Sequence, residues 1–154
     1  MTIAVIPSRY GSSRFEGKPL VKIKGKSMIQ RVVEQTQKSA GVTRTIVATD
    51  DNRIFDAVEA FGGEAVMTSQ ACRSGTDRVA ETANILNIPD NEIVVNIQGD
   101  QPIFNPCTID EMIRPFKQDP ALLMSTLAFK IQDKREITDP KDVKVTFDNK
   151  GFAM

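Results

Sequence analysis

The sequence contains no histidine and no tryptophan, and its 154 residues include only two cysteines, Cys72 and Cys107. The absence of histidine excludes Ser-His and Cys-His nucleophilic catalysis and acid–base catalysis by imidazole. The cysteines are isolated, belong to no CxxC motif and have no histidine to complete a zinc site, so we expect reduced thiols in a cytoplasmic protein. Any chemistry must therefore come from carboxylates, cations, hydroxyl groups or a bound metal ion.

Long hydrophobic runs and a net charge are also missing. The N-terminus lacks the basic and apolar segments of a signal peptide, and no stretch approaches the roughly 20 apolar residues that cross a bilayer. Lys plus Arg and Asp plus Glu both number 20, so we expect neither nucleic acid nor a membrane as a partner. The length is that of one ordinary domain, and we expect residues 1–154 to form a single domain.

Short apolar runs that alternate with helical patterns indicate the fold class. The predicted strands cover residues 2–6, 44–49, 64–67 and 92–97. Helices are predicted to begin at Ser27, which forms a capping box with Gln30, after the acidic pair Asp50-Asp51, and at residue 78. This alternation predicts an α/β protein with three layers, in which a mostly parallel sheet is covered by helices on both faces.

The last third of the chain is predicted to add an antiparallel element. Thr108 and Glu111 match a capping box for a helix running towards Phe116. Residues 122–130 and 142–147 have strand patterns, and Asp-Asn-Lys-Gly at 148–151 is a turn signal. We therefore expect a strand at 122–130 and a hairpin around the turn.

The loop after the first predicted strand is rich in glycine, serine, proline and cations. It carries Arg9, Arg14 and Lys18 against one acid, Glu16. Free backbone N–H groups and cations on such a loop suit a polyphosphate, so we interpret it as a phosphate-binding loop. It matches neither the GxxxxGK[ST] nor the GxGxxG motif, and a solvated basic loop is the alternative.

Three loops follow predicted strands: residues 7–18, 73–78 and 98–102. In a parallel sheet they meet at one rim, which brings the cations of the first loop and Arg78 near Asp100. Cations around one carboxylate are typical of a magnesium–nucleotide site, because Mg²⁺ is usually held by one or two carboxylates with phosphate oxygens and water. The alternative is that Asp100 is only a turn residue after Gly99.

Five motifs of the sequence resemble the 3-deoxy-manno-octulosonate (Kdo) cytidylyltransferase family, the CMP-Kdo synthetases of lipopolysaccharide synthesis. They are IPSRYGSSRFEGKPL at 6–20, ATDD at 48–51, SGTDR at 74–78, NIQGDQP at 96–102 and DPKDVKV at 139–145. They occur in the family's order and cover essentially the whole chain, whereas the sialic acid cytidylyltransferases are a weaker fit. The resemblance implies a nucleotide-diphospho-sugar transferase fold of the Rossmann-like type.

The resemblance also implies an activity and a site. CMP is transferred from CTP to the anomeric hydroxyl of an eight-carbon acidic sugar, with Mg²⁺, and pyrophosphate is released. Arg9, Lys18 and Asp100 are the implied catalytic residues, and Asp100 is the implied magnesium ligand. The implied nucleotide and substrate contacts are Arg9, Ser12, Arg14, Lys18, Ser74, Gly75, Thr76, Arg78 and Gln98. The full-length family members are expected to be homodimers.

Two residues depart from the commonest form of the family's motifs. Glu16 stands where proline is usual, and Gln101 stands where glutamate is usual, which resembles a subgroup acting on 8-amino-Kdo. Family members continue past residue 154 into a segment with a second metal-binding aspartate, so we expect a chain truncated at its C-terminal end. We accordingly expect nucleotide binding without useful turnover. A non-catalytic nucleotide-binding or regulatory protein is the alternative.

Overall fold

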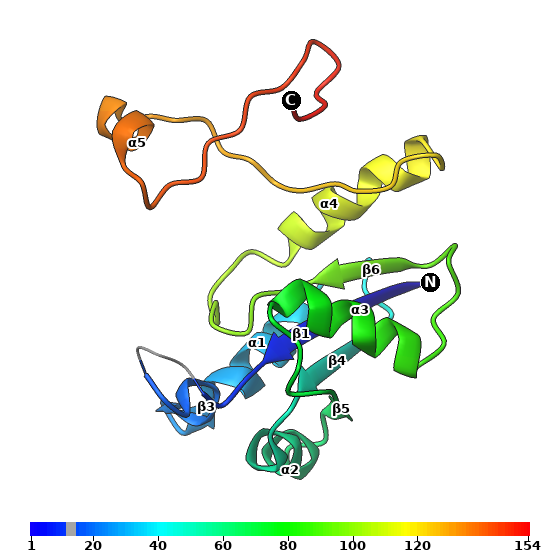
Figure 1. The fold of residues 1–154 in the computed structure, drawn as a ribbon, viewed down its shortest axis with the longest axis vertical. Helices are drawn as coiled ribbons and strands as arrows, with labels where there is room; N and C mark the ends of the chain where they lie inside the picture. The colour runs from blue at the N-terminus through cyan, green and yellow to red at the C-terminus, as the bar shows by residue number, and fades with distance from the viewer. Residues whose placement is uncertain (12–14) are drawn as a thin grey trace. The chain divides into compact units, whose positions relative to one another are not determined.

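The computed structural model describes residues 1–11 and 15–154, which form two compact units, Met1–Leu122 and Leu123–Met154. The first unit contains a four-stranded parallel sheet in the order β5-β4-β1-β6 (Figure 1). The strands are β1 (Thr2–Ser8), β4 (Arg44–Thr49), β5 (Glu64–Met67) and β6 (Ile93–Asn96). All four predicted strands are therefore confirmed, and β1 continues two residues beyond its predicted end.

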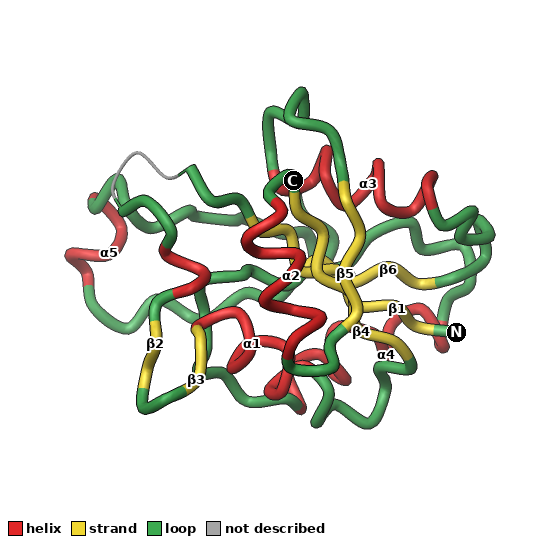
Figure 2. Tube along the Cα trace, turned by 90° about the horizontal axis from the view of Figure 1, so that it is seen from below, coloured by secondary structure: helices red, strands yellow, loops and turns green. Residues whose placement is uncertain are grey.

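Helices cover both faces of this sheet, which confirms the three-layer prediction. On one face, β1 residues Ala4 and Ile6 share a core with α1 (Met28–Thr36), α2 (Asn52–Ala60) and α4 (Cys107–Gln118). On the other face, Ile3 and Val5 pack against Val79 of α3 (Gly75–Ile85). Figure 2 shows α3 and α1 on opposite sides of the strands. Each fully buried Val or Ile contributes about 1.5–3 kcal/mol to stability. Strand β1 buries Ile3, Val5 and Ile6 in this way, more than any other strand of the described sheet.

Side-chain caps fix where several helices begin. Ser27 accepts a hydrogen bond from the Gln30 N–H at 3.3 Å and opens α1 as predicted. The other half of the predicted capping box is not formed, and the Gln30 side chain donates to Glu34 Oε1 at 3.0 Å instead. Ser74 opens α3 through a capping box with Asp77, so this helix begins before residue 78, its predicted start. Between β1 and α1 the chain forms the short helix η1 (Lys18–Leu20) and a two-stranded hairpin of β2 (Lys22–Ile23) and β3 (Lys26–Ser27).

The predicted capping box of Thr108 with Glu111 is wrong. Helix α4 begins at Cys107, and its N-cap, Pro106, makes no side-chain cap bond. Asn105 initiates the turn instead, because its side chain accepts from the Cys107 N–H at 3.1 Å. Thr108 lies inside the helix, and its hydroxyl donates to the Asn105 carbonyl at 2.7 Å. An Asn-Pro sequence therefore replaced the expected threonine cap.

The second unit contains one short helix, α5 (Lys134–Thr138), and little other regular structure among its residues. The strand predicted at 122–130 is wrong, as is the strand at 142–147. A strand needs a hydrogen-bonded neighbour, and here the pairing is limited to one antiparallel bridge, Phe147 with Ala153. That bridge flanks the predicted turn, where the Gly151 N–H donates to Asp148 O. None of the helices in residues 1–11 and 15–154 is both long and apolar enough to span a bilayer.

Candidate functional site

A cleft of about 430 Å³ opens at the carboxyl ends of β1 and β6, beside the N-terminus of α3. The three loops that we expected at one rim all contribute to it. The lining residues are Pro7, Ser8, Arg9, Phe15, Lys18, Pro19, Cys72, Arg73, Ser74, Gly75, Arg78, Gln98, Gly99 and Asp100. The parallel register explains this meeting point, because β1 pairs with β4 on one side and with β6 on the other, so their following loops share an edge.

Most of the predicted site residues therefore lie together. Arg9, Lys18, Ser74, Gly75, Arg78, Gln98 and Asp100 line the cleft. Thr76 lies in the first turn of α3 and is outside the set of described lining residues. Ser12 and Arg14, which complete the predicted phosphate-binding loop, lie outside the residues that the structure describes.

Lys18 and Asp100, which both line the cleft, form an ion pair. The Lys18 Nζ lies 2.7 Å from Asp100 Oδ2, although the two residues are 82 positions apart in the sequence. Lys18 begins η1, which Gly17 introduces with a positive φ of 70° and an N–H bond to the Tyr10 carbonyl at 2.9 Å. Both charged groups remain partly exposed, so each is accessible to a ligand that enters the cleft.

The end of β1 is packed closely between two glycines of the cleft. A Cβ placed on Gly99 would lie 3.0 Å from the Pro7 carbonyl oxygen, and one on Gly75 would lie 3.2 Å from the Pro7 ring. Ser8 follows Pro7, is buried, and its hydroxyl has no hydrogen-bond partner among the described residues. Glycine at both positions lets the neighbouring loops approach the strand end, and this approach shapes the floor of the cleft.

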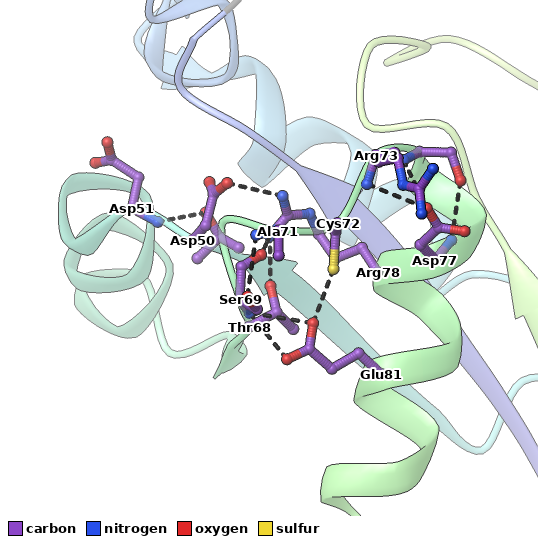
Figure 3. A network of polar contacts seen from close by, with 12 residues as sticks. Asp50, Asp51, Thr68, Ser69, Ala71, Cys72, Arg73, Asp77, Arg78 and Glu81 are labelled. Atoms are coloured by element: carbon purple, nitrogen blue, oxygen red, sulfur yellow. Dashed lines mark hydrogen bonds and ion pairs between the residues drawn. The ribbon is translucent and has the colours of Figure 1, made fainter.

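Arg78 is one of the lining residues, and its side chain is held by protein partners (Figure 3). Its side chain is 5% exposed, and its Nη2 donates to Asp50 Oδ2 at 2.8 Å. Its Nη1 donates to the Thr68 hydroxyl. Arg78 thus lies where the sequence places it, but its guanidinium is directed at the ends of β4 and β5.

The Cys72 thiol is also part of a network beside the cleft (Figure 3). It donates to Glu81 Oε2 at 2.8 Å, and the same carboxylate accepts from the Ser69 N–H at 3.0 Å. Glu81 raises the pKa of the Cys72 thiol, while the bond from Cys72, followed by that from Ser69, lowers the pKa of Glu81. A raised pKa keeps the thiol protonated, which is the opposite of what a nucleophilic cysteine needs.

Asp100 is the acidic residue among the described lining residues, and its oxygens suit a hard cation such as Mg²⁺. Within residues 1–11 and 15–154, no cluster of three or more Asp, Glu, Cys or His side chains could hold a metal by itself. A cation bound here would therefore depend on ligand oxygens and water as well as Asp100. This is the usual binding mode of Mg²⁺ with nucleotide phosphates.

Our sequence reasoning did not single out several lining residues. They are Pro7, Ser8, Phe15, Pro19, Cys72, Arg73 and Gly99. Six of them, all except Cys72, lie within predicted site loops or motifs and could have been inferred from that position. Cys72 directly precedes the predicted loop 73–78, and nothing in its spacing indicates the cleft.

Comparison with known proteins gives consistent results. The 3-deoxy-manno-octulosonate cytidylyltransferase of Desulfatibacillum aliphaticivorans is 58% identical over 99% of this chain and 62% of that protein. The 8-amino-3,8-dideoxy-manno-octulosonate cytidylyltransferase of Shewanella baltica (strain OS155) is 50% identical over 97% of this chain and 62% of that protein. The chain thus spans about three fifths of the length of these curated relatives.

A solved structure extends the similarity to the fold. CMP:2-keto-3-deoxy-manno-octonic acid synthetase, complexed with CTP, superposes with a TM-score of 0.74 and 46% identity. The match covers 79% of this chain and 49% of the solved chain. The profile of the cytidylyltransferase family matches residues 3–154, and the chain belongs to that family.

Proposed function

We propose that this chain is the nucleotide-binding part of an enzyme that transfers CMP from CTP to an eight-carbon acidic sugar, Kdo or its 8-amino analogue, in lipopolysaccharide synthesis. The observation that carries the proposal is the cleft in which Arg9, Lys18 and Asp100 meet. It lies in a fold similar to that of a synthetase solved with CTP. The relatives at 58% and 50% identity are cytidylyltransferases for the two sugars.

The proposed reaction needs no covalent bond to the protein. The anomeric hydroxyl of the sugar attacks the α-phosphorus of CTP, the bond to the β-phosphate oxygen breaks, and the hydroxyl proton is released to solvent. Negative charge grows on the pyrophosphate leaving group during this step. Arg9 and Lys18 are fixed cations at the cleft and would stabilise that charge. A chain without histidine can supply such catalysis.

Asp100 is the proposed magnesium ligand. It is a partly exposed residue of the cleft and supplies carboxylate oxygen, which fits a cation that also takes phosphate oxygens and water. When bound, Mg²⁺ would neutralise phosphate charge and act as a Lewis acid. Lys18, which pairs with Asp100 at 2.7 Å, would then be released towards the nucleotide phosphates.

The test is pyrophosphate release from CTP and Mg²⁺, with Kdo and separately with 8-amino-Kdo. It compares this chain with a chimaera that adds the C-terminal remainder of the Desulfatibacillum aliphaticivorans relative, which this chain does not span. We expect CTP binding by both proteins and release only by the chimaera, with the faster sugar identifying the acceptor. CTP binding without release by either protein would favour a non-catalytic nucleotide-binding protein, and no CTP binding would refute the proposal.

The proposal also includes assembly and location. We expect the longer protein to be a homodimer, which light scattering after size-exclusion chromatography tests. We expect it in the cytoplasm, where the free thiols of Cys72 and Cys107 stay reduced. A monomeric mass for the active protein would contradict the first expectation.

A further inference from the structure

The ATDD motif at residues 48–51 has no role in the proposed reaction, yet its Asp50 is tied to a residue of the cleft. Asp50 directly follows β4, and its Oδ2 accepts from Arg78 Nη2 at 2.8 Å. Arg78 belongs to the SGTDR motif and lies in the first turn of α3. The ATDD motif is therefore linked by an ion pair to the SGTDR motif, which lines the cleft.

A second strand end joins this contact. Thr68 directly follows β5, its N–H donates to the Thr49 carbonyl at 2.8 Å, and its hydroxyl accepts from Arg78. Arg78 is buried in the described structure, so these bonds are largely shielded from water. Removing one partner of a buried ion pair leaves the charge of the other without compensation. The guanidinium thus fastens the start of α3 to the ends of two strands, as Figure 3 shows.

The segment that Arg78 holds, residues 74–78 at the start of α3, forms one wall of the cleft. Ser74 and Gly75 line it, and they lie four and three residues before Arg78, respectively, at the start of α3. Gly75 also lies close to the Pro7 ring at the end of β1, since a Cβ on this glycine would be 3.2 Å from the ring. The Asp77 carboxylate accepts from the Ser74 N–H at 3.1 Å and makes this turn locally rigid. Besides the packing of Val79 against Ile3 and Val5, the polar bonds of Arg78 to Asp50 and Thr68 hold this turn against the sheet.

We propose that Asp50 is a positioning residue for the nucleotide cleft, acting through Arg78 to hold Ser74 and Gly75 in place. This inference rests on the proposed function only in naming the ligand as a nucleotide. Asp50 is not among the described residues that line the cleft, and Thr68 accepts a bond from the same guanidinium. The ATDD and SGTDR motifs then act together: Asp50 orients the Arg78 guanidinium, and Arg78 holds the turn that contains Ser74 and Gly75.

Two measurements test the proposal on this chain. The first is amide hydrogen exchange at residues 74–78 without ligand, and the second is the Kd for CTP with Mg²⁺ at 10 °C. The variants are Asp50→Ala, Arg78→Ala and the double variant. The control is Glu64→Ala, which removes the partner of Arg44 where β4 and β5 begin, at the opposite edge of the sheet.

We expect Asp50→Ala to accelerate amide exchange at residues 74–78 and to raise the Kd for CTP. The expected rise is about tenfold, the lower end of the effect of mutating residues that hydrogen-bond to the direct contacts of a site. The double variant should bind no more weakly than Arg78→Ala, since Asp50 acts through Arg78. Glu64→Ala should change neither quantity. A purely structural ion pair would lower the melting temperature of Asp50→Ala but leave the Kd of the folded protein unchanged.

Three results would overturn the proposal: unchanged exchange at 74–78, an unchanged Kd in folded Asp50→Ala, or losses that add in the double variant. If Asp50→Ala does not fold, Thr68→Val removes one bond to Arg78 without leaving a buried charge alone, and it must show the same two effects at smaller size. If the unmodified chain does not bind CTP, the proposed function fails, and the exchange measurement still decides whether Asp50 positions the wall.

Discussion

Replacement of Lys18 with alanine is the sharpest test of the cleft as a phosphate site. Lys18 pairs with Asp100 at 2.7 Å, and the two side chains are 37% and 53% exposed. An ion pair this exposed contributes about 0–1 kcal/mol to stability, so Lys18→Ala should fold normally. A charge-assisted bond from Lys18 to a phosphate contributes about 1.5–3 kcal/mol. Because binding exchanges the Asp100 carboxylate for a phosphate, we expect the lower end, a rise of about tenfold in the Kd for CTP.

A matched control is present in the same protein. Lys26 pairs with Glu34 at the same 2.7 Å, with side chains 47% and 37% exposed, and neither residue lines the cleft. Isothermal titration calorimetry of Lys18→Ala, Lys26→Ala and the unmodified chain with CTP and Mg²⁺ makes the comparison. The difference for Lys18→Ala should shrink as salt is raised, because screening weakens exposed charges. Equal affinity of all three proteins at low salt would refute the phosphate-site interpretation.

Three further predictions concern stability. Ser8→Ala should raise the free energy of unfolding in urea by about 1 kcal/mol, since it removes a buried hydroxyl without a partner, and a loss of stability would show that this hydroxyl is bonded. Gly99→Ala should cost about 1–3 kcal/mol in the same assay and weaken CTP binding, because its Cβ would lie 3.0 Å from the Pro7 carbonyl. Hydrogen bonds, first that from Ser39, lower the pKa of Asp110 in the folded protein. The ionised carboxylate therefore stabilises the folded protein fully above the ordinary aspartate pKa, and this stabilisation is lost as the pH falls through the lower pKa of the folded state. Asp110→Asn should therefore reduce the loss of stability on acidification, and an unchanged pH profile would contradict this.

The sheet could be predicted because its strands are specified locally. Residues 44–49 and 92–97 are short apolar runs, and each is bounded by polar turn residues that end a strand. A strand that is buried on both faces has a nearly continuous apolar sequence, which is easy to recognise. Strand β4 is buried along nearly its whole length. Once the strands are parallel, their carboxyl ends must share an edge, so the meeting of Lys18 with Asp100 followed from topology.

The second unit could not be predicted in the same way. Residues 122–130 have as strong a strand pattern as β5, but a strand pattern expresses a preference for a pleated, half-buried surface. In the structure Leu123 and Phe129 are 96% and 78% exposed, and no neighbouring strand pairs with them among the described residues. A strand pattern alone is therefore not sufficient, because a strand also needs a hydrogen-bonded neighbour, and the two sheets of the described residues do not include 122–130.

Arg78 shows a different limit of sequence reasoning. A cation in a loop beside a predicted anion site is expected to face the ligand, and at this position no local feature distinguishes that case from a cation that faces the protein. The distinction depends on Asp50, 28 residues earlier, and on burial that leaves the side chain only 5% exposed. A buried guanidinium must satisfy its charge with fixed partners, and Asp50 and Thr68 meet this need within the protein. The exposed cations Arg9 and Lys18 are therefore better suited to phosphate, and Arg78 is better suited to hold the wall against which the nucleotide would lie.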